Sequence, residues 1–561
     1  TILSRLGSAN VLSIKNAKKL IESYEYLRSS EHFLQMIRDE QTHALPTEKA
    51  DETRLAWMMG FDSYEDYIKA LRKITSYVSK QFDKMSTPLV PGEEKQKEEL
   101  VFKALWAHPN DLEIQKKIQD KFNVPQSIFD DIKAFKESAL VKSIRQLGVE
   151  RLDVFIPHLL ACVFQYPEHP SLLKDTLLLT SKVARRSSYL LLLNENPKAL
   201  ERLVLLCYQS SWIAKKMAQF PILLDELLTP LETTLPFDKD ALREALDQTM
   251  RWVQDDLDAE MEKLRQFKLA HVLKLAVNEL LSEKPLDIGL SLTYLAEAIL
   301  EKSATLAWRY IEEKYEDKAD ILKKLPRLGV IAYGNLGSFD LHYQSDLDLV
   351  FIYDDTAFMK QCSLEEKNFA HEVYLRLAQR IIHILSTQTL TGKLFEVDVR
   401  LRPGGGAGLL VTSLTAYTNY LEKDAWTWEH QALVRARLLL GESTLEREFL
   451  RLKKQVLSKK SEMILLKEEI LNMRQKMNVH AKTSKEGVSL KSQSGGITDI
   501  EFMVQYFVLS HADKHPELLT QTKTTKLLDL LADLHEIPVS WQQDLSQALD
   551  FYHRQLRLSI L

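Results

Sequence analysis

A glycine turn followed closely by two aspartates constrains the fold of this chain more than any other stretch. Residues 328–333 are short and apolar and lead to Gly334, which predicts a buried strand entering a tight turn. Asp346 and Asp348 alternate with apolar residues on a second predicted strand. Because successive strand side chains face opposite ways, both carboxylates should project from one face of that strand.

Two carboxylates on one strand face are unfavourable unless something lies between them. At roughly 4 Å they repel by about 4 kcal/mol in a medium with an effective dielectric constant of about 20. A hard divalent cation offsets this repulsion, and carboxylate oxygens suit Mg²⁺. In the turn, Gly337 would let backbone N–H groups approach a phosphate, and the Ser338 hydroxyl would add a donor. The alternative for the two aspartates is an acidic strand end beside a turn.

The order of these parts resembles a known superfamily. A Gly-Ser pair at one strand end, then a short spacer and Asp-x-Asp on the next strand, is similar to the nucleotidyltransferase superfamily associated with DNA polymerase β. That resemblance implies a third carboxylate on a neighbouring strand. Residues 395–401 form a third predicted strand, on which Glu396, Asp398 and Arg400 share one face. Asp398 is the expected third metal ligand.

Length and composition indicate an ordinary globular protein. With 561 residues, 45% of them apolar and 27% charged, the chain should form roughly three or four domains. A net charge of −5 argues against nucleic acid as a partner. Cys162, Cys207 and Cys362 stand far apart, which indicates a reducing compartment and no zinc site. Because no apolar run reaches the length of a membrane span and the first residues carry no signal-peptide pattern, we expect a cytoplasmic protein without a membrane partner.

The chain is expected to be mainly α-helical, with one α/β domain that carries a mixed sheet. Its first residues have mid-helical character and no initial methionine, so we expect a fragment of a longer protein. A proline- and glycine-containing stretch followed by a run of charges predicts a linker. The expected parts are a helical region at 1–85, the linker at 86–98, a helical bundle at 99–288, the nucleotidyltransferase core at 289–440 and a C-terminal helical bundle at 441–561.

Helical and strand patterns alternate in the core domain. A long helix starting near Ser291 should lead into it, and Ser363 with Glu366 predicts a capping box at the start of a second helix. The expected strands are 328–333, 347–353 and 395–401, and the expected later helices are 363–386, 415–440, 445–480 and 497–561.

Three other features are given a structural interpretation. The loop at 401–408 has no G-x-G-x-x-G register and no Walker lysine, which argues against a dinucleotide site or a P-loop. His511 and His515 stand at i and i+4, but without acidic or cysteine partners in register they are expected to be surface or loop histidines. Trp426 and Trp428 are expected to lie in the core.

Longer motifs make the resemblance more specific. Residues 426–437 read Trp-Thr-Trp-Glu-His-Gln-Ala-Leu-Val-Arg-Ala-Arg, and together with 398–403, 410–413 and 495–502 they resemble glutamine synthetase adenylyltransferases. Residues 185–197 resemble the same family upstream of the core. The motifs occur in the family's order, and the resemblance covers essentially the whole chain.

The resemblance implies an activity. Family members are tandem duplications in which the first half removes AMP from glutamine synthetase by phosphorolysis and the second half attaches it. Residues 426–432 resemble the attaching half, and residues 1–85 look like the closing helices of the removing half. The implied reaction transfers AMP from ATP to a tyrosine hydroxyl of glutamine synthetase, releases pyrophosphate and down-regulates nitrogen assimilation. The implied regulators are a PII-type signal protein and glutamine.

The resemblance also implies roles for the core residues. Asp346 and Asp348 would hold two Mg²⁺ ions. Asp398 would bind the second ion and accept the tyrosine proton, directly or through water. Gly337 and Ser338 would hold the β- and γ-phosphates of ATP.

Charged residues around the core have two interpretations each. Arg400 and Arg402 would stabilise charge on the transferring phosphoryl group, or would form ion pairs at the strand end. Lys491, with Asp499 or Glu501, would reach the nucleotide from the helical side, or would serve in capping and ion pairing.

Three positions depart from the family pattern. Lysine is usual where Asn335 stands and a second glycine where Ser338 stands, so a positive charge near the triphosphate is missing. Gly404 stands where serine or asparagine is common after Arg-Pro.

Two other functions stay open. A uridylyltransferase acting on a signal protein would be expected to carry His-Asp hydrolase motifs, which the sequence lacks. A catalytically silent regulatory scaffold is the other. The retention of three carboxylates argues against it, because buried acids without a metal are costly.

Overall fold

The computed structural model divides the chain into two compact units, Thr1–Val101 and Phe102–Leu561. No helix among the described residues is long and apolar enough to pass through a lipid bilayer. The structure describes residues 14–38, 45–46, 48–86, 93–228, 238–253, 256–282, 286–355, 362–459, 463–481 and 489–561.

The described part of the N-terminal unit is mainly helical. Leu55 and Tyr67 are fully buried in its small apolar core. The Tyr67 and Ser30 hydroxyls lie 2.5 Å apart in a hydrogen bond, so the buried polar groups satisfy each other. Its elements are α2 (Ile14–Arg38), α3 (Lys49–Met58), α4 (Tyr64–Ser86) and the start of α5 (Glu93–Ala107).

Residues 93–98 of the linker predicted at 86–98 are helical in the structure. α5 already begins at Glu93, and residues 87–92 lie outside the described part of the chain. The charge run that suggested a linker consists of Glu, Lys and Gln, which are good helix formers, so it belongs to a helix.

Short helices fill the first part of the second unit. Proline begins α10 at Pro170 and α12 at Pro197, where the missing N–H has no helical partner to lose. The helices are α6 (Leu112–Phe122), α7 (Ser127–Glu137), α8 (Ala139–Ser143), α9 (Gln146–Val163), α10 (Pro170–Val183), α11 (Ser187–Glu195), α12 (Pro197–Gln209), α13 (Ser211–Gln219) and the 3₁₀ helix η1 (Pro221–Leu228).

Longer helices lead to the sheet. The helix expected from near Ser291 is α16, which begins at Ile288 because the Asp287 carboxylate accepts the Leu290 N–H. The helices are α14 (Lys239–Met250), α15 (Leu257–Leu281), α16 (Ile288–Lys314), the 3₁₀ turn η2 (Glu316–Lys318) and α17 (Ala319–Leu322).

A mixed five-stranded sheet lies at the centre of the second unit. β1 lies between β2 and β5 and is antiparallel to both. β3 and β4 run parallel to β2 along its other edge, β3 at its start and β4 at its end. The strands are β1 (Gly329–Ala332), β2 (Leu347–Tyr353), β3 (Val397–Asp398), β4 (Val411–Ser413) and β5 (Arg437–Leu440).

The remaining helices cover the sheet or close its turns. They are α18 (Gly334–Gly337), α20 (Leu364–Ser386), η3 (Gly405–Ala407), α21 (Leu414–Lys423), α22 (Thr427–Val434), α23 (Ser443–Leu457), α24 (Met463–Ala481), α25 (Ile497–His511), η4 (Pro516–Thr520), α26 (Thr524–Asp533) and α27 (Val539–Leu558).

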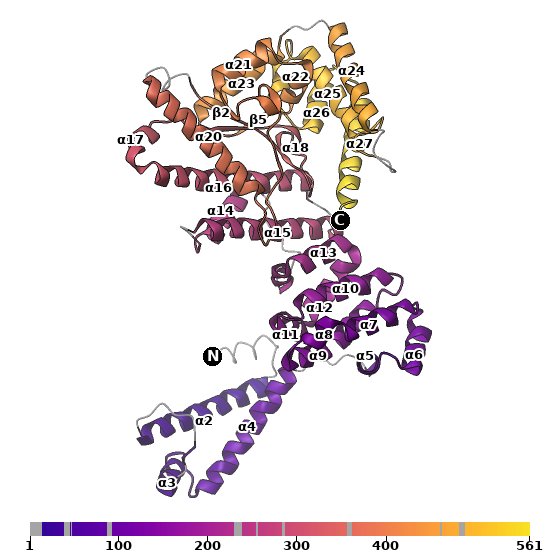
Figure 1. Ribbon diagram of the computed structural model, residues 1–561. Helices are drawn as coiled ribbons and strands as arrows, with labels where there is room; N and C mark the ends of the chain where they lie inside the picture. Colours follow the sequence, from indigo (N-terminus) through magenta and orange to yellow (C-terminus); the bar gives the residue numbers. More distant parts are fainter. Residues whose placement is uncertain are drawn as a thin grey trace. The chain divides into compact units, whose positions relative to one another are not determined.

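Both faces of β2 are buried. Leu347, Leu349 and Phe351 pack on one face into the core that α16 and α20 share. Val350 and Ile352 pack on the other face against α21, α23 and α25. Figure 1 shows α16 on one side of the sheet and α21 to α23 on the other. This double cover explains the continuous apolar run after Asp348.

The strongest local signals were interpreted correctly. β2 and α20 lie where they were expected, and the predicted Ser363–Glu366 capping box is present. The expected strand at 395–401 is shorter, because only Val397 and Asp398 pair with β2.

The C-terminal helices differ from expectation. The helix predicted at 415–440 is wrong, since α21 ends at Lys423 and β5 follows α22. The run predicted at 497–561 is likewise divided into α25, α26 and α27. Trp426 and Trp428 are 71% and 37% exposed, so their assignment to the core is wrong. Trp426 stands at the N-cap of α22, outside the helical stripe that packs inward.

Candidate active site

Three aspartates meet at the start of β2. Asp346 precedes the strand, Asp348 lies within it, and Asp398 stands opposite Asp348 on parallel β3. One oxygen from each carboxylate lies within 4.8 Å of the others. Among the described residues, these form the one group of three or more acidic, histidine or cysteine side chains close enough to share a metal ion. The donor set is entirely carboxylate oxygen, which suits Mg²⁺.

The three carboxylates repel one another. Burial first, and then the charges of Asp346 and Asp398, raise the pKa of Asp348 to about 6, while Lys491 and Arg435 oppose the rise. The pKa of Asp398 is lowered, chiefly by its hydrogen bond from Arg400. A divalent cation among the three would favour their ionised forms.

Gly334 makes room for Asp348. Its φ of +54° lies in the left-handed region, and a Cβ at this position would lie 2.1 Å from an Asp348 carboxylate oxygen. The turn at Gly334 therefore packs directly against the Asp348 carboxylate.

The backbone N–H groups of Gly337 and Ser338 already donate hydrogen bonds within the turn. A Cβ at Gly337 would lie 2.1 Å from the Arg435 carbonyl oxygen. Ser338 is fully buried, and the Gly337 and Ser338 N–H groups donate to the carbonyls of Tyr333 and Gly334. Phosphate binding by Gly337 and Ser338 therefore stays a prediction.

Arg435 is the residue that the sequence reasoning missed. It is 6% exposed and donates to the Ser338 hydroxyl at 2.5 Å and the Asn335 side-chain oxygen at 3.3 Å. Its guanidinium also lies 2.7 Å from the Glu501 carboxylate, while its buried Nε has no partner among the described residues. A cation therefore lies beside Asn335. The available signal was the arginine within the motif at 426–437.

The turn that carries Arg435 is fixed at both ends. The buried Lys453 ammonium donates to the carbonyls of Val434 at 2.9 Å and Ala436 at 3.0 Å, and burial lowers the pKa of Lys453 to about 7. Arg437 donates to the Gly337 carbonyl at 3.1 Å, which ties β5 to the glycine turn.

The two predicted arginines make structural contacts here. Arg400 pairs with Asp398, with 2.9 Å between its Nε and a carboxylate oxygen, yet its side chain is 80% exposed. Arg402 donates to the carbonyls of Val399 at 2.8 Å and Gly406 at 3.0 Å and so closes the loop after β3. These contacts match the ion-pairing interpretation for Arg400. A role toward phosphate stays a prediction for both.

Three residues were predicted to reach the nucleotide from the helical side, or to serve in capping and ion pairing: Lys491, Asp499 and Glu501. Lys491 is exposed, and its charge acts on the pKa of Asp348. Asp499 pairs with Arg474 and accepts the Gly495 N–H at 2.5 Å, which is a capping role. Glu501 pairs with Arg435.

The two histidines at i and i+4 share an acidic neighbour from another element. His511 and His515 place their Nε2 atoms 3.0 and 3.2 Å from the Glu536 carboxylate. They do not belong to the metal-competent group identified in the described part of the chain.

Comparison with known proteins identifies the family. The family model described as glutamate-ammonia ligase adenylyltransferase matches residues 200–452, which include all three aspartates. The bifunctional glutamine synthetase adenylyltransferase/adenylyl-removing enzyme of Hahella chejuensis is 37% identical over 98% of this chain. Residues 200–452 belong to the glutamate-ammonia ligase adenylyltransferase family, and almost the whole chain is similar to the Hahella enzyme.

Other comparisons define the extent of the match. The family member of Pseudomonas aeruginosa with the same description is 38% identical over 94% of this chain. The chain spans 58% of the Hahella protein and 56% of the Pseudomonas protein, a little more than half of each. A second family model, described as GlnD PII-uridylyltransferase, matches residues 1–86, a segment that contains none of the three aspartates.

Proposed function

We propose that this chain transfers AMP from ATP to a tyrosine hydroxyl of glutamine synthetase, releasing pyrophosphate and so down-regulating nitrogen assimilation. The observation that carries the proposal is the group of three aspartates, within 4.8 Å of one another, inside the segment that the family model matches. The relatives are named for both attachment and removal of AMP. The motif at 426–437 resembles the attaching half, which favours transfer.

In this proposal Asp346, Asp348 and Asp398 hold two Mg²⁺ ions. The all-oxygen donor set and the raised pKa of Asp348 support such a site, because a cation would offset the repulsion. When bound, Mg²⁺ would offset the charge of the triphosphate and favour loss of the tyrosine proton.

The protein's own groups would handle the proton and the phosphates. The ionised Asp398 carboxylate would accept the tyrosine proton, directly or through water. Its hydrogen bond from Arg400 lowers the pKa of Asp398, so Asp398 would be the stronger base once Arg400 turns away. The tyrosine oxygen then attacks the α-phosphorus, the bond from that atom to the bridging oxygen breaks, and pyrophosphate leaves.

The triphosphate would lie at the glycine turn. Arg435 would supply a positive charge beside Asn335, and Lys491 would add a second cation. Contact with the Ser338 hydroxyl would require Arg435 to release it. Arg400 is exposed and could turn from Asp398 toward the transferred phosphoryl group.

Mass measurement of glutamine synthetase subunits tests this proposal. Subunits incubated with the chain, Mg²⁺ and ATP should gain one AMP group, and the chain with Asp348→Asn should add none. Asp513→Asn, at an exposed aspartate outside the site, is the matched control and should retain activity. Addition of UMP from UTP to a PII-type protein would instead support the uridylyltransferase alternative.

Regulation and compartment follow as lesser proposals. A PII-type protein and glutamine would alter the rate. The match of residues 1–86 to a model named for PII uridylylation supports the first of these. The three cysteines stand far apart in the sequence, which supports a reducing compartment such as the cytoplasm. Transfer rates measured with each regulator added separately would test the regulation.

A further inference from the structure

A cavity of about 400 Å³ lies between α13, η1, α15 and the loop that leads into β3. Its size is within the range of pockets that hold small ligands. None of the three aspartates lines it. It approaches them through Ser345, which precedes Asp346, and through Glu396, whose carbonyl accepts the Leu347 N–H at 2.9 Å.

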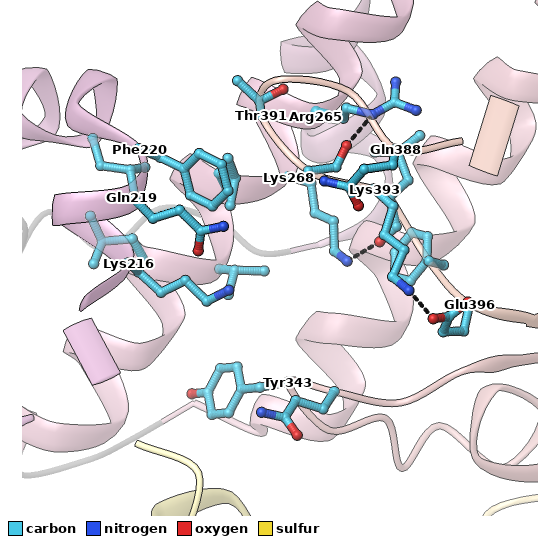
Figure 2. A pocket seen from close by; sticks show the side chains of 18 of the residues that line it. Lys216, Gln219, Phe220, Arg265, Lys268, Tyr343, Gln388, Thr391, Lys393 and Glu396 are labelled. Carbon is cyan, nitrogen blue, oxygen red and sulfur yellow. Dashed lines mark hydrogen bonds and ion pairs between the residues drawn. The ribbon is translucent and has the colours of Figure 1, made fainter. Parts of the chain in front are cut away.

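Three lysines from different elements converge on this cavity. Figure 2 shows Lys216 extending from α13 toward Lys268 of α15 and Lys393 of the loop. Lys393 pairs with Glu396, and Lys268 donates to the Leu394 carbonyl. The Lys216 ammonium has neither a carboxylate nor a carbonyl partner among the described residues. Positive charge in the cavity therefore exceeds negative charge.

Lys216 and Lys268 are also poorly solvated. Burial, with the charges of Lys216 and Lys393, lowers the pKa of Lys268 to about 7, and burial lowers the pKa of Lys216. A bound anion would oppose these effects, because its charge favours the protonated ammonium groups.

Part of the remaining wall is apolar and aromatic, beside polar residues such as Gln219, Arg265 and Gln388. Lys268 lies 3.8 Å from the centre of the Phe395 ring, and Lys216 lies 5.7 Å from that of Trp212 and 5.8 Å from that of Phe220. Such walls can hold the carbon skeleton of a ligand, while the ammonium groups bind its charged end.

We propose that this cavity binds a small organic anion, with its carboxylate or phosphate group among Lys216, Lys268 and Lys393 and its apolar body against Trp212 and Phe220. The site is separate from the three aspartates and needs no metal ion. The inference does not depend on the proposed AMP transfer.

Calorimetry in Mg²⁺-free buffer tests this site with three probes of one shape. Phenyl phosphate and benzoate carry the two candidate anionic groups, and benzyl alcohol carries no charge. At least one anion should bind about tenfold more tightly than the alcohol, because a charge-assisted contact is worth about 1.4 kcal/mol or more. The anion that binds more tightly distinguishes a phosphate ligand from a carboxylate ligand.

Substitutions locate the binding. Lys216→Met should weaken anion binding about tenfold, whereas Lys215→Met, at the exposed neighbour on α13 outside the cavity, should not. Lys393→Gln provides a second test and should also weaken anion binding, because its exposed side chain can be changed with little effect on folding. Thermal unfolding without probe shows whether each variant is folded. Equal binding of alcohol and anions, no binding of either anion, or binding lost in Asp348→Asn but kept in Lys216→Met would each overturn the proposal.

Discussion

Asp348 is partly buried beside two other carboxylates, an arrangement that costs free energy when no cation is present. Its pKa of about 6 reflects that cost, since the protein disfavours the ionised form. An uncharged residue would serve the fold better at this position. We interpret the retained carboxylate as a functional requirement.

Asp348→Asn should therefore raise the free energy of unfolding in Mg²⁺-free buffer at pH 7.5, on the order of 1 kcal/mol, and with it the melting temperature. The same substitution should abolish AMP transfer. Mg²⁺ should raise the melting temperature of the unsubstituted chain but not that of the variant, because binding to the folded state alone is stabilising. Thermal unfolding with and without Mg²⁺ measures both effects. The same response to Mg²⁺ in both proteins would remove Asp348 from the ligand set.

Arg435 can be tested against its own ion-pair partner. Arg435→Gln and Glu501→Gln both break one buried pair, so each should destabilise the fold by about 3–5 kcal/mol. Only Arg435→Gln removes a cation from the glycine turn, so it alone should raise the KM for ATP, about tenfold. Similar KM values for the two variants would limit Arg435 to a structural role.

At the scale of elements, the glycine turn and β2 act together. Gly334→Ala would place a methyl group 2.1 Å from an Asp348 oxygen at a positive φ, so Asp348 or the turn must move. AMP transfer should fall at least about a hundredfold, because small misplacement of reacting groups is costly. Gly406→Ala, where a Cβ meets nothing within 4 Å, is the control and should retain activity. Comparable activity in the two variants would contradict this role of the turn.

The sequence predicted the elements that have strong local signals. The period-two pattern located β2 and its aspartates, and the Ser363–Glu366 box located α20. β5 could not be found in this way, because its short apolar run becomes a strand only by pairing with β1. The contacts of Arg435 were hidden for the same reason, since Asn335 and Ser338 lie about a hundred positions away in the chain.

At the scale of the whole chain, the sequence contains one Gly-Ser turn with Asp-x-Asp, at 337–348. One core should attach AMP and, like any catalyst, also run that reaction backwards with pyrophosphate. It should not release AMP as ADP with phosphate, the reaction that the resemblance assigns to a second core. Adenylylated glutamine synthetase, given phosphate or pyrophosphate separately, tests this by the nucleotide released. Substantial ADP with phosphate would contradict the single-core account.

The most direct test of AMP transfer follows the two ends of ATP separately. The chain, Mg²⁺ and glutamine synthetase are incubated with ATP labelled at the α-phosphate or at the γ-phosphate, and both the protein and the released pyrophosphate are counted. The account predicts α-label on glutamine synthetase and γ-label in pyrophosphate, with both lost in Asp346→Asn. Label from the γ-phosphate on glutamine synthetase, or no transfer of α-label, would contradict it.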